Sequence, residues 1–126
     1  MSGTDESDPS ELADAVFRIL SDEYRRCVLY YLLDRDAATV EELATVATGW
    51  VQARESAVEI ATPDDRERVR AALHHVHLPR IADAGFVRYD HNSGEVALER
   101  VPVVLESILE QSLAEDRTGR DRSEDP

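Results

Sequence analysis

The sequence predicts a mainly helical α+β domain, and three observations predict it. Apolar residues recur at the three- and four-residue spacing of a helix through most of the chain. Two short runs of β-branched and aromatic residues, at 86–90 and 95–99, interrupt this pattern and flank a turn that contains glycine. A last helical pattern follows them. The length of 126 residues fits one domain of this kind.

The N-terminal half of the chain predicts three helices. The first begins at Pro9, because Asp8 is a good N-cap and proline fits the first helical position. The second covers about 22–34, where apolar residues share one face. The third begins with the capping box Thr39-Val40-Glu41-Glu42 and runs to about 52.

A longer helix is predicted from about 63 to 84. The start signal Thr62-Pro63-Asp64-Asp65 combines a threonine N-cap, a proline at the first position and an acid at the third. Pro79 has no amide hydrogen, so we expect a kink or a split near residue 77, and Gly85 supplies the C-terminal stop. The residues expected to face the core are Val69, Ala72, Leu73 and Val76.

The pattern then changes from helix to strand. The runs at 86–90 and 95–99, joined by His91-Asn92-Ser93-Gly94, predict a two-stranded hairpin. A final helix begins at Pro102 and continues to about 115. We therefore divide the chain into a domain at 9–100, a C-terminal helix at 101–115 and two polar ends, 1–8 and 116–126, that we expect to be disordered.

The chain is strongly acidic. It has 27 acidic and 14 basic residues, a net charge of −13, and every basic residue is an arginine. Dense carboxylate without lysine is typical of halophilic proteins; the alternative is an acidic protein with no such adaptation. No apolar run approaches the roughly 18 residues of a membrane span, and the start lacks the pattern of a signal peptide. We expect a cytoplasmic protein without a membrane partner.

The acidity is absent from one stretch. Residues 63–90 contain five acidic and five arginine residues, and three of the four histidines. A surface that must approach a polyanion avoids an excess of carboxylates, because like charges repel. The stretch 63–90 is therefore the first place to look for a nucleic-acid contact.

The element order is that of a winged helix-turn-helix: three helices, a longer helix that ends at a glycine, and a hairpin. In that architecture one helix enters the major groove of DNA and the hairpin, or wing, touches the flanking backbone. We predict a winged helix-turn-helix with a two-stranded β-hairpin wing and an additional C-terminal helix. The expected reading helix is about 63–84, and the expected wing is 86–99.

Short motifs spread over residues 15–99, approximately, resemble those of a known protein family. They are Arg25-Arg26, Glu42-Leu43-Ala44, Trp50, Arg66–Arg70, His77-Leu78-Pro79 and Ala84-Gly85. Together they resemble a winged-helix domain family that is widespread in haloarchaea and mostly of unassigned function, and the chain is similar to small prokaryotic winged-helix repressors. The resemblance implies the fold and a regulatory role. One departure is the connection at 54–61, which is longer than the roughly 3–4 residues that usually join such helices.

Six residues are candidates for DNA contact. Arginines in the first two turns of the reading helix suit base edges and phosphates, and two of them share a face by four-residue spacing. The wing residues would reach the DNA backbone or the minor groove. The alternative is a solvated surface on which acids such as Asp64 and Glu67 pair with the arginines. The candidates are Arg66, Arg68, Arg70, His74, Arg88 and His91.

The C-terminal helix carries a broad apolar stripe. It either packs on its own domain or pairs with a second copy, and we predict a homodimer, since winged-helix dimers read paired half-sites. The residues expected at the dimer interface are Val101, Val104, Leu105, Ile108 and Leu109.

The signals for metal binding, redox sensing and catalysis are weaker. His74 and His77 have a spacing that suits a shared ion, but no set of residues has the pattern of a closed metal site, so we predict no metal and no cofactor. Cys27 lies on an apolar face and is expected to be a buried thiol, with redox sensing as the alternative if it is exposed. No phosphate-binding glycine loop, nucleophile elbow or triad is present, so we do not expect an enzyme.

We therefore predict a homodimeric DNA-binding transcription regulator. The alternative is a winged-helix protein–protein interaction module that does not bind DNA directly. The electrostatics separate the two hypotheses. If Arg66, Arg70 and Arg88 form one positive face, DNA is favoured; if acids neutralise them, a protein partner is favoured.

Overall fold

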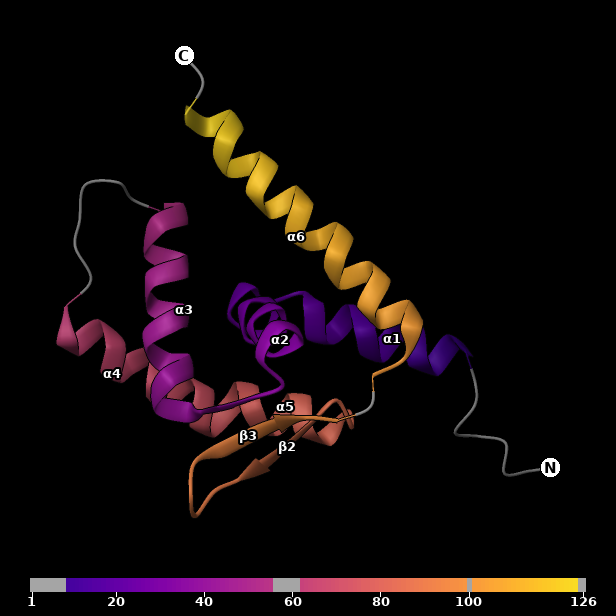
Figure 1. The fold of residues 1–126 in the computed structure, drawn as a ribbon, viewed down its shortest axis with the longest axis horizontal. Coiled ribbons are helices and arrows are strands. Elements are labelled where there is room, and N and C mark those ends of the chain that lie inside the picture. The colour runs from indigo at the N-terminus through magenta and orange to yellow at the C-terminus, as the bar shows by residue number, and fades with distance from the viewer. Residues whose placement is uncertain (1–8, 56–61, 100, 125–126) are drawn as a thin grey trace.

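The computed structural model describes residues 9–55, 62–99 and 101–124, which form a mainly helical α+β fold with a small antiparallel sheet (Figure 1). The predicted segment 1–8 and most of the connection 54–61 lie outside these residues. The elements in chain order are α1 (Pro9–Leu20), α2 (Glu23–Arg35), β1 (Ala37–Thr39), α3 (Val40–Glu55), α4 (Pro63–Ala72), the π-helical turn η2 (Leu73–His77), α5 (Leu78–Asp83), β2 (Val87–Asp90), β3 (Glu95–Leu98) and α6 (Val103–Glu124).

Two helix starts, those of α3 and α4, lie at predicted caps. At α4 the Thr62 hydroxyl accepts from the Asp65 amide, and the Asp65 carboxylate accepts from the Thr62 amide, which completes the predicted capping box. At α3 only half of the predicted box forms. The Thr39 hydroxyl accepts from the Glu42 amide, whereas the Glu42 carboxylate accepts from the Tyr31 hydroxyl of α2.

The predicted interruption of the long helix is confirmed as a π-helical turn. It covers Leu73–His77 and ends two residues before Pro79, with the Leu78 amide donating to the Leu73 carbonyl. A π turn places one extra residue in the helix, which rotates the following side chains around the axis. This rotation explains why Val76, which we expected in the core, is 40% exposed. Gly85 ends α5 with a positive φ of 87°, as its predicted role as a stop requires.

The predicted hairpin is confirmed, but the sheet has a third strand. β2 and β3 pair antiparallel around a turn in which Gly94 has a φ of 79°. The three-residue β1 lies between the predicted second and third helices, where the sequence analysis predicted no strand; it pairs with β3 and gives the order β1–β3–β2. The Val40 amide donates to the Gly94 carbonyl at 2.8 Å, so the start of α3 is fixed to the hairpin turn.

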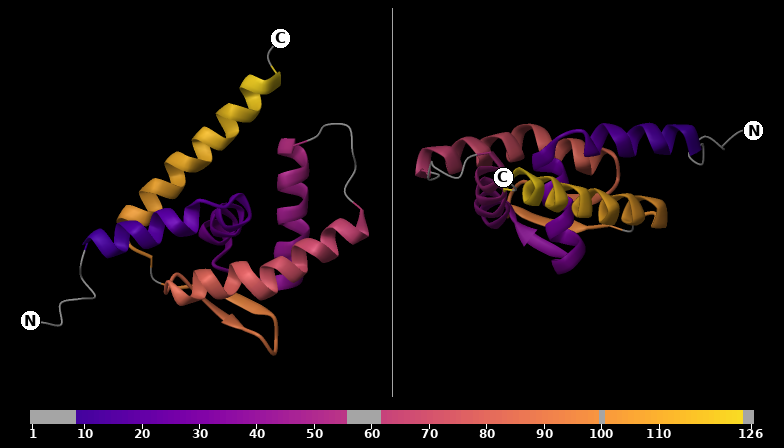
Figure 2. Two further views of the ribbon diagram at one scale, coloured as in Figure 1. Left: turned by 180° about the vertical axis from the view of Figure 1, so that it is seen from behind. Right: turned by 90° about the horizontal axis from the view of Figure 1, so that it is seen from above.

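The C-terminal helix packs on its own domain. Leu105 and Leu109 are fully buried in the core of the chain, although we expected them at a dimer interface. The Asp116 carboxylate accepts from Arg26 at 3.2 Å and from Tyr30 at 2.8 Å, which joins α6 to α2. We expected the helix to end near 115, but α6 continues to Glu124 and its last turns extend away from the other elements (Figures 1 and 2).

The core lies between the helices and one face of the sheet. Its largest fully buried side chains come from α1, α2, α3, the α4–η2–α5 helix, β3 and α6: Val16, Val28, Leu29, Leu32, Leu43, Leu73, Leu78, Ile81, Val96, Leu105 and Leu109. None of the helices within residues 9–55, 62–99 and 101–124 combines the length and the apolar character of a transmembrane span.

Candidate functional site

The start of α3, the helix α4–η2 and the hairpin meet at one face. We call it the α3–α4–hairpin face and define it by Glu41, Arg66, Arg70, His74 and His91. A cavity of about 230 Å³ lies between the start of α3, Arg70, His74 and the hairpin turn. Three of the six predicted DNA contacts, Arg70, His74 and His91, therefore line a single hollow, to which the start of α3, the α4–η2 helix and the hairpin each contribute.

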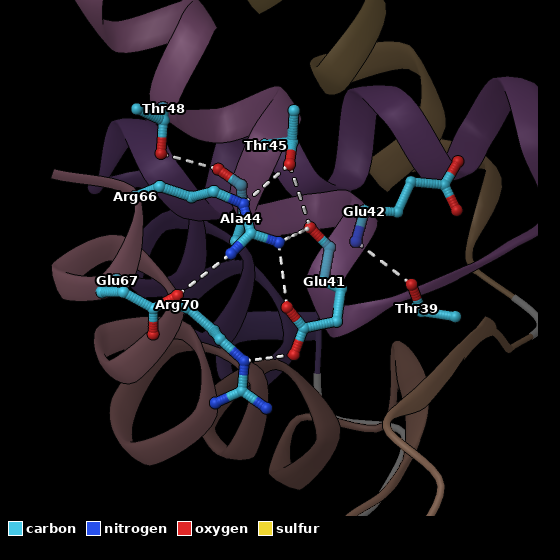
Figure 3. A network of polar contacts seen from close by, with 9 residues as sticks. All are labelled: Thr39, Glu41, Glu42, Ala44, Thr45, Thr48, Arg66, Glu67 and Arg70. Atoms are coloured by element: carbon cyan, nitrogen blue, oxygen red, sulfur yellow. Dashed lines mark hydrogen bonds and ion pairs between the residues drawn. The ribbon is translucent and has the colours of Figure 1, made fainter. Parts of the chain in front are cut away.

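Arg66 and Arg70 share a face, as their spacing predicted, but that face is turned toward α3 (Figure 3). The guanidinium of Arg66 lies 2.9 Å from the Glu41 carboxylate, and it also donates to the Glu41 carbonyl at 3.0 Å and to the Thr45 hydroxyl at 2.9 Å. Arg70 donates to the other carboxylate oxygen of Glu41. Hydrogen bonds from Arg66 and then from Arg70 lower the pKa of Glu41.

The remaining predicted arginines also have carboxylate partners. Arg68 pairs with Asp65 one turn earlier on α4. Arg88 of β2 forms an ion pair with Glu99, with 2.7 Å between Nε and the carboxylate oxygen. Since Arg66 and Arg70 share Glu41, acids neutralise all four arginines, and they do not form one unpaired positive face. By the electrostatic criterion stated above, this pairing favours a protein partner over DNA.

The predicted histidines form a ring cluster with a residue that the sequence analysis did not single out. His74 Nδ1 lies 2.7 Å from the Tyr89 hydroxyl, and the ring centroids of Tyr89 and His91 are 4.5 Å apart. Burial lowers the pKa of His74, and the neighbouring His75 and His91 lower it further. Tyr89 and His91 alternate along the hairpin and so lie on one side of it, a period-two signal that was present in the sequence.

His74 and His77, the pair considered for a shared ion, face different partners. His77 is buried, and its Nδ1 lies 3.1 Å from Arg25 of α2, whereas His74 faces the hairpin. Among the residues that the structure describes, no group of three or more His, Cys, Asp or Glu is placed to hold a metal ion. Cys27 is buried as predicted, and this burial raises the pKa of its thiol to about 12.

The comparisons identify the family. A family described as "Domain of unknown function (DUF7344)" matches residues 17–97. The chain belongs to the DUF7344 family. Its DUF7344 span runs from the second half of α1 to β3 and contains all six candidate DNA contacts, whereas α6 lies outside it. No curated protein and no solved structure matches the chain.

Proposed function

We propose that this DUF7344 protein is a transcription regulator that binds DNA through a winged helix-turn-helix. The observation that carries the proposal is the topology. Two helices, α3 and α4–η2–α5, precede a hairpin, and the short β1 joins the sheet at β3 in the order β1–β3–β2. This connectivity supports the proposal, because winged-helix proteins bind DNA with a helix and a hairpin that follows it in the chain.

The proposed docking uses the exposed side of α4–η2. Arg68, Ala71 and His75 are exposed on it, and the small Ala71 allows close approach of a DNA strand. Arg66 and Arg70 lie at its edge. Their shared partner Glu41 is itself exposed, and ion pairs between exposed groups contribute little to stability. Phosphate groups can therefore replace Glu41 as the partner of both arginines at small cost.

A protein-interaction module is the second candidate. The pairing of Arg66, Arg68, Arg70 and Arg88 with carboxylates favours it, because paired arginines attract a polyanion less strongly. Asp64 and Glu67 at the start of α4 would also repel phosphates. The two candidates differ in the macromolecule that co-purifies with the protein.

The experiment is a genome-wide pull-down of DNA with the tagged full chain in its own cells. The double variant Arg66→Ala/Arg70→Ala removes both guanidiniums, and Arg35→Ala, which removes an exposed arginine of α2 that is not part of this face, is the matched control. We expect discrete DNA peaks that disappear in the double variant and persist in the control, with circular dichroism showing that both variants fold. Absence of peaks, with protein partners co-purifying instead, would overturn the proposal in favour of the second candidate.

We also propose that the regulator is a homodimer, with an interface that keeps Val104 from the predicted set and adds its neighbour Val103. Val103 and Val104 at the start of α6 are 77% and 51% exposed, whereas Leu105 and Leu109 belong to the core. The double change Val103→Asp/Val104→Asp is therefore expected to produce a folded monomer in light scattering. A folded dimer that persists in this variant would contradict an interface at this surface.

A further inference from the structure

A second cavity lies outside the α3–α4–hairpin face. It has a volume of about 350 Å³, opens to solvent and is lined by residues of α1, α2 and α5, three helices that Figure 2 shows from two further sides. A volume of this size is at the lower end of the roughly 300–1,000 Å³ that is usual for small-molecule sites. Its lining residues are Ala15, Arg18, Ile19, Arg25, Arg80, Asp83 and Ala84.

Three arginines from three different helices line this cavity. Arg25 is only 7% exposed, and its guanidinium is held in place by the Ile19 carbonyl at 2.9 Å, the Arg18 carbonyl at 3.2 Å and His77 Nδ1 at 3.1 Å. A guanidinium has five N–H donors, so these three contacts leave donors of Arg25 available. The fixed Arg25 thus forms the base of the cavity, with Arg18 and Arg80, both exposed, at its rim.

The two rim arginines of this cavity differ from the arginines of the α3–α4–hairpin face, which are paired with carboxylates. Among the described residues, neither Arg18 nor Arg80 forms an ion pair with a carboxylate, although the chain has 27 acidic residues. Burial lowers the pKa of Arg25; nearby Asp22 opposes this shift, and the positive charge of Arg80 adds to it. Among the described residues, Asp83 is the one acid in the lining. The cavity therefore gathers positive charge that an anion would stabilise.

The lining also has an apolar part. Ala15 and Ile19 of α1 and Ala84 after α5 contribute aliphatic surface beside the guanidiniums. Arginine binds carboxylates and phosphates through paired N–H donors, and the aliphatic surface favours an apolar body on the same molecule. A bare inorganic ion would leave this surface unused.

We propose that the cavity between α1, α2 and α5 binds a small organic anion, with a carboxylate or phosphate group on Arg18, Arg25 and Arg80 and a short apolar body on Ala15, Ile19 and Ala84. Since α5 continues the reading helix, the anion is placed to act as an effector of DNA binding; this regulatory role, unlike the binding itself, rests on the proposed function.

The test is a calorimetric titration of the full chain at constant ionic strength, without DNA. The probes are hexanoate, butyl phosphate, inorganic phosphate and, as an uncharged control, 1-hexanol. We expect saturable one-to-one binding of hexanoate or butyl phosphate, and the tighter of the two identifies the anionic group. Inorganic phosphate is expected to bind more weakly and hexanol not at all. Failure of both organic anions to bind, or hexanol binding as tightly as hexanoate, would overturn the proposal.

Substitutions of the lining arginines test whether the organic anion binds in this cavity. Arg80→Gln and Arg18→Gln change exposed rim residues and leave the buried Arg25 network in place. Each is expected to weaken binding of the preferred probe by at least about tenfold, since each removes a charged hydrogen-bond donor. Arg35→Gln, an exposed arginine at the far end of α2, is expected to bind as the unchanged chain does. Equal affinity in all three variants would place the anion elsewhere and contradict the proposal. Because DNA is absent, the result does not depend on the proposed function.

Discussion

Two groups of arginines in this chain have opposite surroundings. Arg66 and Arg70 at the α3–α4–hairpin face share the carboxylate of Glu41, whereas Arg18 and Arg80 at the second cavity have no carboxylate in ion-pair distance within the described residues. Both groups lie in a protein with a net charge of −13. The difference teaches that net charge and charge runs do not locate a binding surface, because the partners of each arginine come from other elements of the fold.

The largest expected effect is on stability, at the base of the second cavity. Arg25→Ala would leave the Ile19 and Arg18 carbonyls and His77 without their buried donor. Loss of a buried charged group with several partners costs about 2–4 kcal/mol in the free energy of unfolding. Urea denaturation followed by circular dichroism measures it. Substitution of the exposed Arg35 by alanine is the control. If Arg25→Ala and Arg35→Ala lowered the free energy of unfolding by the same small amount, the contacts of Arg25 would not stabilise the fold.

A smaller effect is expected on DNA affinity at the α3–α4–hairpin face. Glu41→Gln removes the carboxylate that Arg66 and Arg70 share, so both guanidiniums become available to phosphates. We expect DNA affinity to rise by roughly three- to tenfold at about 0.1 M salt, with a steeper dependence on salt concentration. Fluorescence anisotropy gives both quantities. Glu110→Gln, exposed on α6, controls for the change in net charge. Identical DNA affinities of Glu41→Gln and Glu110→Gln would show that Arg66 and Arg70 do not contact DNA.

The smallest expected effect is on the pH dependence of the free energy of unfolding. It distinguishes His77, beside the second cavity, from the histidines of the α3–α4–hairpin face. Burial lowers the pKa of His77, with Arg25 and Arg80 lowering it further against an opposing effect of Asp22. A histidine whose folded pKa lies below its unfolded value of about 6.5 stabilises the fold above that pH, and this contribution is lost as the pH falls toward the folded pKa. The free energy of unfolding should therefore decrease from about pH 7 to about pH 5.

Urea denaturation at a series of pH values tests this expectation. His77→Gln should flatten the decrease, because the substituted side chain does not titrate in this range. The exposed His75→Gln should keep the slope of the unchanged chain. A slope that survives in His77→Gln would assign the pH dependence to other groups, with His74 beside Tyr89 as the next to substitute.

Local signals predicted much of the fold. The cap at Thr62, the stop at Gly85 and the turn at Gly94 each act within a few residues, and each lies where the sequence placed it. Pro79 predicted an interrupted helix correctly, because a missing amide hydrogen is a local defect. The identity of the interruption as a π turn, and with it the exposure of Val76, was not predicted.

The sequence did not show which residues far apart in the chain contact one another in the fold. The strand Ala37–Thr39 is short and has little β propensity, so only its pairing with β3 makes it a strand. The apolar stripe of α6 suited a dimer as well as the chain's own core, and only packing placed Leu105 inside. The spacing of Arg66 and Arg70 gave their common face, but not the Glu41 carboxylate that this face meets.

The most direct test of the account is one titration with three proteins. A DNA fragment recovered from a pull-down peak is titrated with the unchanged chain, with Arg66→Ala/Arg70→Ala and with Arg18→Ala/Arg80→Ala, each checked for folding. The account predicts that the first double variant loses DNA binding and that the second retains it while losing butyl phosphate or hexanoate. Retention of DNA binding by the first variant, or equal loss in both, would contradict the division of the arginines between the two sites.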